Sequence, residues 1–206
     1  MKIKTLLLGN MQTNGYVVSD ENHHCLIIDP GANGKKVVHY LTENELVPEA
    51  VLLTHGHFDH IGAVDYLYEH YHCPIYLHQD DLEMLDNPQL NLSVYENPFT
   101  VKAPVQSSHE EMKFGDFDVQ WLHLPGHCPG SSMIYLKDEN IIFSGDVLFK
   151  GSIGRFDFPN SSKYETIESI NKIKEYDFDA VIYPGHGPNS TSVSYTHLTL
   201  PTILLV

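Results

Sequence analysis

The stretch Thr54-His55-Gly56-His57-Phe58-Asp59-His60 decides how the rest of this sequence is interpreted. It follows the apolar run Val51-Leu52-Leu53, a pattern typical of a buried strand that ends at a functional site. Histidine is the commonest ligand of transition metals in proteins, and a carboxylate completes the ligand sets of hydrolytic zinc centres. The density of histidine and aspartate over residues 54–60 therefore predicts a metal site at the end of a strand.

Three later segments offer further ligands in similar settings. His127 lies in Pro125-Gly126-His127, Asp146 in Ser144-Gly145-Asp146 and His186 in Pro184-Gly185-His186. Each segment follows an apolar strand, and the preceding glycine lets the backbone turn tightly, so that the ligand points into a cleft at the strand ends. A two-metal hydrolase needs roughly three protein ligands per metal and a bridging group, and these segments supply the missing candidates.

The composition is that of a globular protein with an acidic surface. The chain has 206 residues, enough for one domain with a sizeable core, and 42% of them are hydrophobic. The net charge of −15 argues against a nucleic-acid surface, which needs clustered Lys and Arg. Cys25, Cys73 and Cys128 form no C-x-x-C pair, so we expect free thiols in a reducing compartment.

The beginning of the chain and its hydropathy bear on location. Residues 1–4 lead into a short strand rather than into the long apolar region of a signal peptide. No run of about 18 apolar residues is present, as a membrane-spanning helix would need. We therefore expect a cytoplasmic protein that interacts with neither membrane nor nucleic acid.

Hydrophobic periodicity predicts strands and helices that alternate along much of the chain. The expected strands are residues 3–8, 16–18, 25–28, 51–53, 75–77, 117–124, 133–136, 141–143 and 181–183. The expected helices are residues 33–46, 61–71, 80–85 and 164–173. Residues 86–112 are polar with three prolines, so we expect a long surface connection that walls the site. The periodicity alone indicates a mixed α and β protein.

The order of the motifs from Asp29 to His186 resembles the metallo-β-lactamase superfamily. More narrowly, the stretch from Gly145 to Phe158 resembles the small glyoxalase II-like hydrolases, whose pattern is close to GD-x-LF-x-GSIGR-x-DF. The resemblance implies an α/β (α+β) fold, a four-layer αββα sandwich with metals at one edge. It also implies that residues 1–192 form one hydrolase domain.

The same resemblance assigns roles to the ligands. It implies that one metal is held by His55, His57 and His127, the second by Asp59, His60 and His186, with Asp146 as the bridge and Asp29 as a support of the ligand loop. The two divalent ions would be zinc, with iron or manganese as alternatives. Asp59 and Asp146 would be catalytic, since they hold and orient a bridging hydroxide that attacks the substrate.

The implied reaction is hydrolysis of a hydroxyacylglutathione or a related small-thiol thioester. Arg155 and Lys150 are the candidate contacts for an anionic substrate tail. The C-terminal helical domain by which full glyoxalase II enzymes bind glutathione is not accommodated in this chain, so another small thiol or ester stays open. The alternatives are a persulfide dioxygenase with one iron, a lactonase, and a metal-binding protein without catalysis. The sequence leaves the oligomeric state open.

Two groups of residues are set apart from this site. The remaining histidines of residues 1–192 have no motif partner and are expected at the surface or in packing: His23, His24, His39, His70, His72, His78, His109 and His123.

Residues 193–202 resemble the translation of a transposase adapter used in sequencing libraries. We therefore expect residues 193–206 to be a non-native tail, behind a domain truncated at its C-terminus, and His197 not to be a ligand.

Overall fold

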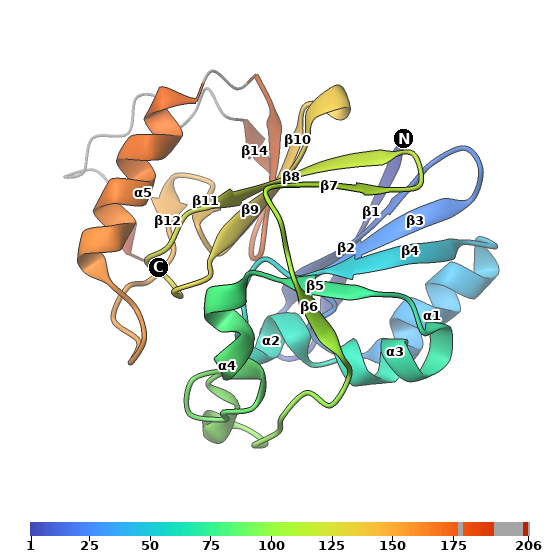
Figure 1. Cartoon of the computed structure of the whole chain (residues 1–206), viewed down its shortest axis with the longest axis horizontal. Helices are drawn as coiled ribbons and strands as arrows, with labels where there is room; N and C mark the ends of the chain where they lie inside the picture. Colours follow the sequence, from blue (N-terminus) through green and yellow to red (C-terminus); the bar gives the residue numbers. More distant parts are fainter. Residues whose placement is uncertain (177–178, 192–203, 206) are drawn as a thin grey trace.

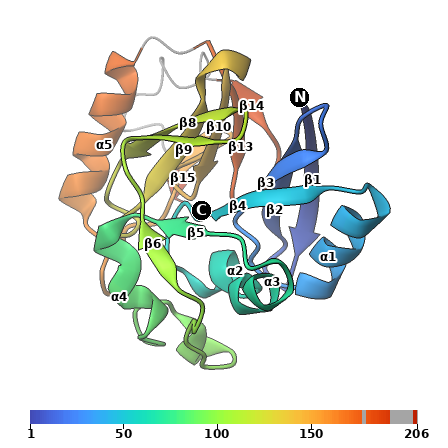
Figure 2. The ribbon, with the colours of Figure 1, turned by 45° about the vertical axis from the view of Figure 1, so that its right-hand side comes forward.

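The computed structural model describes residues 1–176, 179–191 and 204–205. Two six-stranded sheets lie face to face in the middle of the molecule, and helices cover both outer faces (Figure 1). The view turned by 45° shows the same order of layers, with α5 on one side and α1 to α3 on the other (Figure 2). The predicted αββα sandwich is confirmed.

The first sheet is built from the N-terminal half of the chain. Its strands follow one another in chain order: β1 (Lys2–Leu8), β2 (Thr13–Ser19), β3 (His24–Ile28), β4 (Val47–Leu52), β5 (Ile75–Leu77) and β6 (Val105–Ser107). The first three strands are antiparallel and the last four run parallel to one another. Because parallel strands need crossover connections, helices α1 (Gly34–Glu43), α2 (Phe58–Ile61) and α3 (Val64–Tyr71) lie between them.

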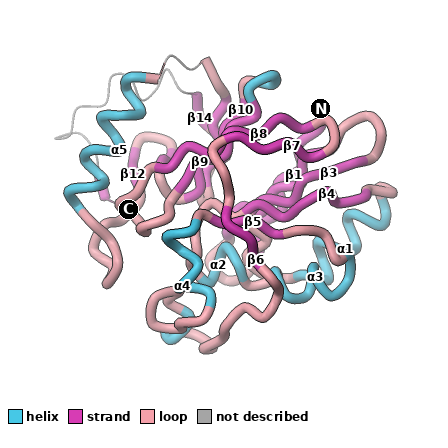
Figure 3. Tube along the Cα trace, viewed as in Figure 1, coloured by secondary structure: helices cyan, strands magenta, loops and turns pink. Residues whose placement is uncertain are grey.

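The second sheet comes from the C-terminal half. Its order is β14 (Ser190–Thr191), β13 (Val181–Pro184), β10 (Ile141–Gly145), β9 (Ser132–Leu136), β8 (Phe117–His123) and β7 (Glu111–Phe114). Helix α5 (Lys163–Glu175) connects β10 and β13, which are parallel. A separate small sheet contains β11 (Leu148–Phe149), β12 (Ser152–Ile153) and β15 (Leu204–Leu205). The strands lie inside and the longer helices outside (Figure 3).

Strand alternation explains the layers. Along β3, Leu26 and Ile28 pack between the two sheets, whereas Cys25 and Ile27 pack against the helices of the first sheet. On the second sheet, Phe143 of β10 faces the first sheet, while its neighbour Ile142 belongs to the core beneath α5. Both faces of these central strands are buried, because successive side chains point to opposite faces of a sheet that is covered on both sides.

The structure corrects two expectations about secondary structure. The helix expected over residues 61–71 is divided, since α2 ends at Ile61 and α3 begins at Val64. A Cβ on Gly62 would lie 2.2 Å from the carbonyl oxygen of Gly31, and the Ala63 N–H donates to Pro30 O over 2.9 Å. This close backbone contact with the loop after β3 fixes the break.

The connection expected over residues 86–112 holds more structure than its sequence indicates. It contains β6, the first residues of β7 and the 3-10 turn η2 (Ser93–Tyr95). Outside this connection, the chain forms three more short elements, namely η1 (Gln79–Asp81), α4 (Leu82–Leu85) and η3 (Lys137–Glu139). Strand β6 has three residues and pairs with β5 at the edge of the first sheet, too short a stretch for a visible alternation. Strand β7 extends the second sheet beside β8.

The expected non-native tail falls mostly outside the described residues. Within it, Leu204 and Leu205 form β15 and pair in parallel with Ser152 and Ile153 of β12. Residues 192–203 and 206 lie outside the described part, so the nature of the tail stays a prediction.

Candidate metal centre

The predicted ligands converge where strands of both sheets end. His55 and His57 follow β4, and Asp59 and His60 lie in α2 directly behind them. The second sheet supplies His127 after β8, Asp146 after β10 and His186 after β13. The structure thus brings together all seven residues that the sequence singled out, in groups whose ligand atoms lie within 4.8 Å of one another.

Three histidines form the first group. The His127 Nε2 atom lies 3.0 Å from His57 Nδ1, and the ring of His55 lies 4.8 Å from that of His57 and 4.9 Å from that of His127, measured between centroids. His127 Nδ1 donates to the carbonyl oxygen of Arg155 over 2.8 Å. That bond fixes the tautomer of His127 and leaves its Nε2 unprotonated and able to bind a cation, the arrangement usual for metal-binding histidines.

The second group contains Asp59, His60 and His186. Asp59 Oδ2 lies 3.2 Å from His186 Nε2 and 3.6 Å from His60 Nε2. The same oxygen accepts a 2.7 Å hydrogen bond from the Thr13 hydroxyl. Thr13 at the start of β2 therefore holds the carboxylate in place.

Asp146 lies between the two groups. Its Oδ2 atom is 3.6 Å from His127 Nε2 and 3.7 Å from His186 Nε2, and its Oδ1 atom is 3.4 Å from His60 Nε2. One carboxylate is therefore close to ligands of both groups. This is the position that a bridging ligand needs.

Unpartnered atoms show that the centre fits bound cations. His55 Nε2, His60 Nε2 and Asp146 Oδ1 are buried and have no hydrogen-bond partner among the residues that the structure describes. A buried polar atom without a partner costs about 1–3 kcal/mol, and more when it is charged, so such a concentration calls for a ligand. Imidazole nitrogens and carboxylate oxygens are donors suited to zinc, iron or manganese.

Burial and mutual charge set the pKa values in the metal-free centre. Burial holds the pKa of His55 and of His57 well below its usual range, and the neighbouring histidines add to the effect, so both imidazoles are neutral and able to bind metal at pH 7. Burial alone would raise the pKa of Asp146, but the histidines around it, His60 first, lower it to about 2. The carboxylate is thus ionised without a metal.

Asp29 supports the ligand loop, as the sequence led us to expect. Its carboxylate accepts from the backbone N–H of Thr54 at 2.8 Å and from the Thr54 hydroxyl at 2.6 Å. His60 Nδ1 donates to the same carboxylate at 2.9 Å. Asp29 itself has φ +47°, an uncommon value for a residue other than glycine.

We expect Asp29→Asn to weaken zinc binding at the second group by about 10- to 100-fold, because loss of the charged partner of His60 Nδ1 lowers the basicity of its Nε2. Competition with a chromophoric chelator measures the affinity. Asp65→Asn, at a carboxylate that accepts from the backbone N–H groups of Lys102 and Ala103, is the matched control. Equal affinities in both variants would contradict this role.

Sequence reasoning missed Asp81, a fully buried carboxylate that connects the two ligand loops. It accepts from the backbone N–H of Gly56 at 3.0 Å and from that of Gly130 at 2.5 Å. Gly56 lies between His55 and His57, and Gly130 lies in the loop of His127. Asp81 belongs to no motif, and no signal in its own neighbourhood marks it.

The ionisation of Asp81 makes the fold sensitive to pH. Burial raises the pKa of Asp81 to about 7, against an ordinary value of 3.8. A raised carboxyl pKa contributes stability that is fully present below the ordinary value and is lost as pH rises through about 7. We therefore expect the free energy of unfolding, relative to that of Asp81→Asn, to fall as the pH rises from the ordinary carboxyl pKa of 3.8 to about 7. The fall is at most about 1.4 kcal/mol per pH unit. Urea unfolding at several pH values tests it, and parallel curves for both proteins would contradict it.

The loop of His186 is held by the first sheet. Asn14 of β2 donates from Nδ2 to the carbonyl oxygens of Pro184 and Gly187, at 3.0 and 2.9 Å. The Tyr16 hydroxyl donates to Pro184 O over 2.5 Å. These bonds connect the two sheets directly beside the ligand.

Gly145 shows why a glycine precedes Asp146. Its φ is +47°, and a Cβ there would lie 2.2 Å from the hydroxyl oxygen of Thr54. A side chain at this position would push β10 away from the strand end that carries His55. The glycine therefore sets how close the two halves of the centre lie.

Cys128 lies against the first group. Its Sγ atom is 3.3 Å from His57 Nε2, and the residue is fully buried. Burial raises the pKa of the Cys128 thiol well above its ordinary value, so the metal-free form is a neutral thiol.

The two candidate substrate contacts differ in their surroundings. Arg155 donates from Nε and Nη2 to the two carboxylate oxygens of Asp157, both at 2.9 Å. Its guanidinium lies 4.6 Å from the centroid of the Phe158 ring, which in turn packs on His57. Lys150 is exposed at the turn between β11 and β12.

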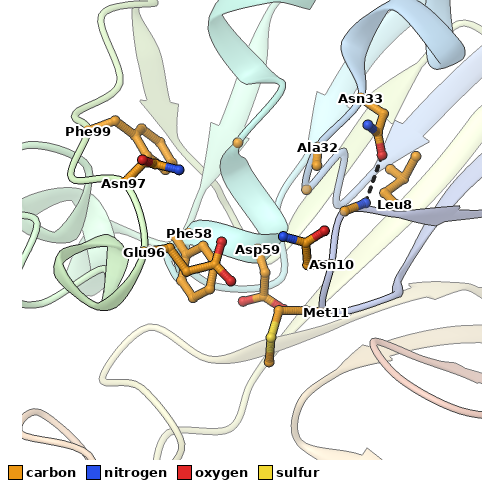
Figure 4. A pocket seen from close by; sticks show the side chains of 13 residues that line it. Leu8, Asn10, Met11, Ala32, Asn33, Phe58, Asp59, Glu96, Asn97 and Phe99 are labelled. Carbon is orange, nitrogen blue, oxygen red and sulfur yellow. Dashed lines mark hydrogen bonds between the residues drawn. The ribbon is translucent and has the colours of Figure 1, made fainter.

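A pocket of about 230 Å³ opens beside Asp59 (Figure 4). Its lining includes Phe58, Met11 and Phe99 as apolar surface, with Asn10 and Glu96 as polar groups. None of the described residues that line this pocket is Lys or Arg. It offers room for a small, uncharged part of a substrate next to the metal ligands.

Within the described ranges, no helix is both long and apolar enough to cross a membrane.

Comparison with known proteins agrees with this geometry. The sequence profile of the metallo-beta-lactamase superfamily matches residues 8–186. "Probable metallo-hydrolase YqgX" of Bacillus subtilis (strain 168) is 40% identical over 196 residues, which cover 92% of each chain. "Hydroxyacylglutathione hydrolase GloC" of Haemophilus influenzae (strain ATCC 51907 / DSM 11121 / KW20 / Rd) is 32% identical over 197 residues, 93% of each chain.

Solved structures are similar over nearly the whole chain. The crystal structure of BLEG-1 B3 metallo-beta-lactamase superposes with a TM-score of 0.88 at 37% identity, covering 94% of this chain and 95% of the other. The structure of TTHA1623 in a di-iron-bound form gives a TM-score of 0.84 at 35% identity, and the match covers 94% of this chain and 97% of the other. The chain therefore belongs to the metallo-beta-lactamase superfamily of metallo-hydrolases.

Proposed function

We propose that the protein hydrolyses small-molecule thioesters of the hydroxyacylglutathione type, with two divalent metal ions as cofactors. The observation that carries the proposal is the position of Asp146 between two ligand groups, each containing buried donors. Zinc is our first choice of metal, and the di-iron form of a 35% identical structure supports iron as an alternative. A hydroxyacylglutathione hydrolase at 32% identity over nearly the full length supports the thioester substrate.

The metal pair, when bound, would make hydroxide available at neutral pH and polarise the acyl carbonyl. The residues of the chain would hold and orient what reacts. Asp59, fixed by the Thr13 hydroxyl, is placed to accept a hydrogen bond from the attacking water. Asp146 lies between the two ligand groups and would be the ligand that both metal ions share.

The charge state of the centre favours a thiolate leaving group. The histidines around Asp59 and Asp146 outweigh burial and lower the pKa of both carboxyls, so neither donates a proton near neutral pH. A thiol has a pKa near 8.5, so a leaving thiolate needs little protonation. Thioester hydrolysis therefore suits this centre better than cleavage of an ester with a poorer leaving group.

The two parts of the substrate would bind on different surfaces. The described lining of the pocket beside Asp59 contains no basic side chain, so we place the acyl group there. An anionic thiol tail would then bind to Arg155 and Lys150, on the segment that follows Asp146. Arg155 would have to exchange Asp157 for the substrate carboxylate, a bidentate exchange that suits a guanidinium.

The direct experiment is turnover of S-lactoylglutathione by the zinc-loaded protein, followed by release of free thiol. Lactoyl esters of other small thiols, a homoserine lactone and a chromogenic β-lactam are assayed in parallel, and oxygen uptake is measured with glutathione persulfide on the iron-loaded protein. Preferred turnover of thioesters supports the proposal. Preferred turnover of the lactam or lactone, or oxygen consumption with persulfide, would overturn it and name the activity that replaces it.

A further inference from the structure

A second cluster of metal-binding side chains lies away from the seven ligands. His78 directly follows β5, Asp80 lies two residues later in η1, and His123 ends β8. The rings of His78 and His123 stack with centroids 3.8 Å apart and planes inclined by 14°. No sequence pattern connects these residues, because β5 and β8 belong to different sheets and only the fold brings their ends together.

The carboxylate of Asp80 faces both imidazoles. Its Oδ2 atom lies 3.7 Å from His78 Nδ1 and 3.8 Å from His123 Nε2. The donor atoms of the three residues all lie within 4.8 Å of one another. Two imidazoles and a carboxylate are the protein ligands of many zinc sites, in which water occupies the fourth position.

The wall beside the cluster contains buried polar atoms that lack a hydrogen-bond partner in the described part of the chain. His78 and His123 line a pocket of about 240 Å³ together with Ser108 and Trp121. Within the described ranges, the Ser108 hydroxyl and the Trp121 Nε1 atom have no hydrogen-bond partner, and Trp121 as a whole is 4% exposed. Buried donors of this kind are unusual, and they indicate that water or another ligand belongs in this pocket.

The hydrogen bonds of the two histidines show which nitrogens a metal could reach. Among the described residues, His78 Nδ1 accepts only a 3.3 Å bond from the Asp80 N–H, and His123 Nε2 donates to Pro129 O at 2.8 Å. The His123 side chain is 36% exposed, so its ring has space to turn out of the stack and place Nε2 toward a shared ion.

We propose that His78, Asp80 and His123 form a further binding site for a divalent transition metal of the zinc class, separate from the catalytic centre. The exposed His109 and Glu110 line the same pocket and are placed to contribute a ligand or to hold a metal-bound water. The proposal does not depend on which substrate the catalytic centre accepts.

Trp121 makes this site directly observable. It is the single tryptophan of the chain, and it lines the same pocket as the two histidines. Nickel(II) quenches nearby indole fluorescence, so a nickel titration of the metal-free protein reports on occupation of the pocket. We expect saturable quenching in the unmodified protein and at least about tenfold weaker binding in His123→Ala and in His78→Ala.

Three controls make the titration decisive. His39→Ala replaces an exposed histidine that pairs with Glu43 on α1, and it should bind nickel as the unmodified protein does. Asp146→Asn impairs the catalytic centre, and it should retain the quenching. Equilibrium dialysis against zinc should show one additional ion per chain that His123→Ala lacks, while circular dichroism confirms that the variants are folded.

Absence of saturable quenching, or equal quenching in His123→Ala and the unmodified protein, would overturn the proposal. Loss of quenching in Asp146→Asn would also overturn it, since the signal would then come from the catalytic centre.

Discussion

Replacing Asp146 with asparagine is expected to reduce thioester hydrolysis by at least about a thousandfold, because the change removes the charge that both ligand groups share. Asp146 is within 3.7 Å of ligand atoms from His60, His127 and His186, so no single neighbour is able to compensate. The amide is nearly isosteric with the carboxylate, which limits the effect on packing. Steady-state kcat/KM with S-lactoylglutathione, together with metal content, measures the result.

Asp118→Asn is the matched control for this variant. Asp118 is exposed on β8 and pairs with Lys113 across the β7–β8 ladder. The control should keep full activity and metal content. An Asp146→Asn protein that retains more than about a tenth of the activity would show that this carboxylate is not the shared ligand.

Replacing Asp81 with alanine is expected to lower the free energy of unfolding by about 3 kcal/mol, because two buried N–H groups, those of Gly56 and Gly130, lose their acceptor together. The same change releases the ligand loops on both sides of the centre, so we expect metal affinity to fall with stability. Urea unfolding at pH 6, with metal removed by a chelator, isolates the effect on the fold.

Asp86→Ala is the appropriate comparison, since Asp86 is exposed at the end of α4 in the same segment. It should change stability by less than about 0.5 kcal/mol. Similar unfolding curves for the two variants would mean that Asp81 does not hold the loops.

The ligands of the centre could be predicted from the sequence because their signal is local. His127, Asp146 and His186 each come shortly after an apolar strand and directly after a glycine, and for Gly145 the close approach of Thr54 shows why only glycine fits. The layers could be predicted for a similar reason, since strands such as β3 carry hydrophobic residues on both faces. Which ligand holds which ion stays a prediction.

The residues that the sequence did not reveal act through contacts that are distant along the chain. Asp81 binds backbone groups 25 and 49 positions away, and nothing in residues 78–85 indicates either partner. The break between α2 and α3 depends on the backbone of Gly31. The pairing of His78 with His123 likewise arises only when β5 and β8 come to neighbouring positions in the two layers.

The most direct test of the account is the number of metal ions bound by the centre. It is best measured by mass spectrometry of the zinc-reconstituted His123→Ala protein, in which the proposed surface site is removed. We expect about two zinc ions per chain, and about one after His57→Ala or His186→Ala is added, because each change disables one ligand group. A single ion per chain that is lost in His57→Ala but unaffected by His186→Ala would contradict a dinuclear centre.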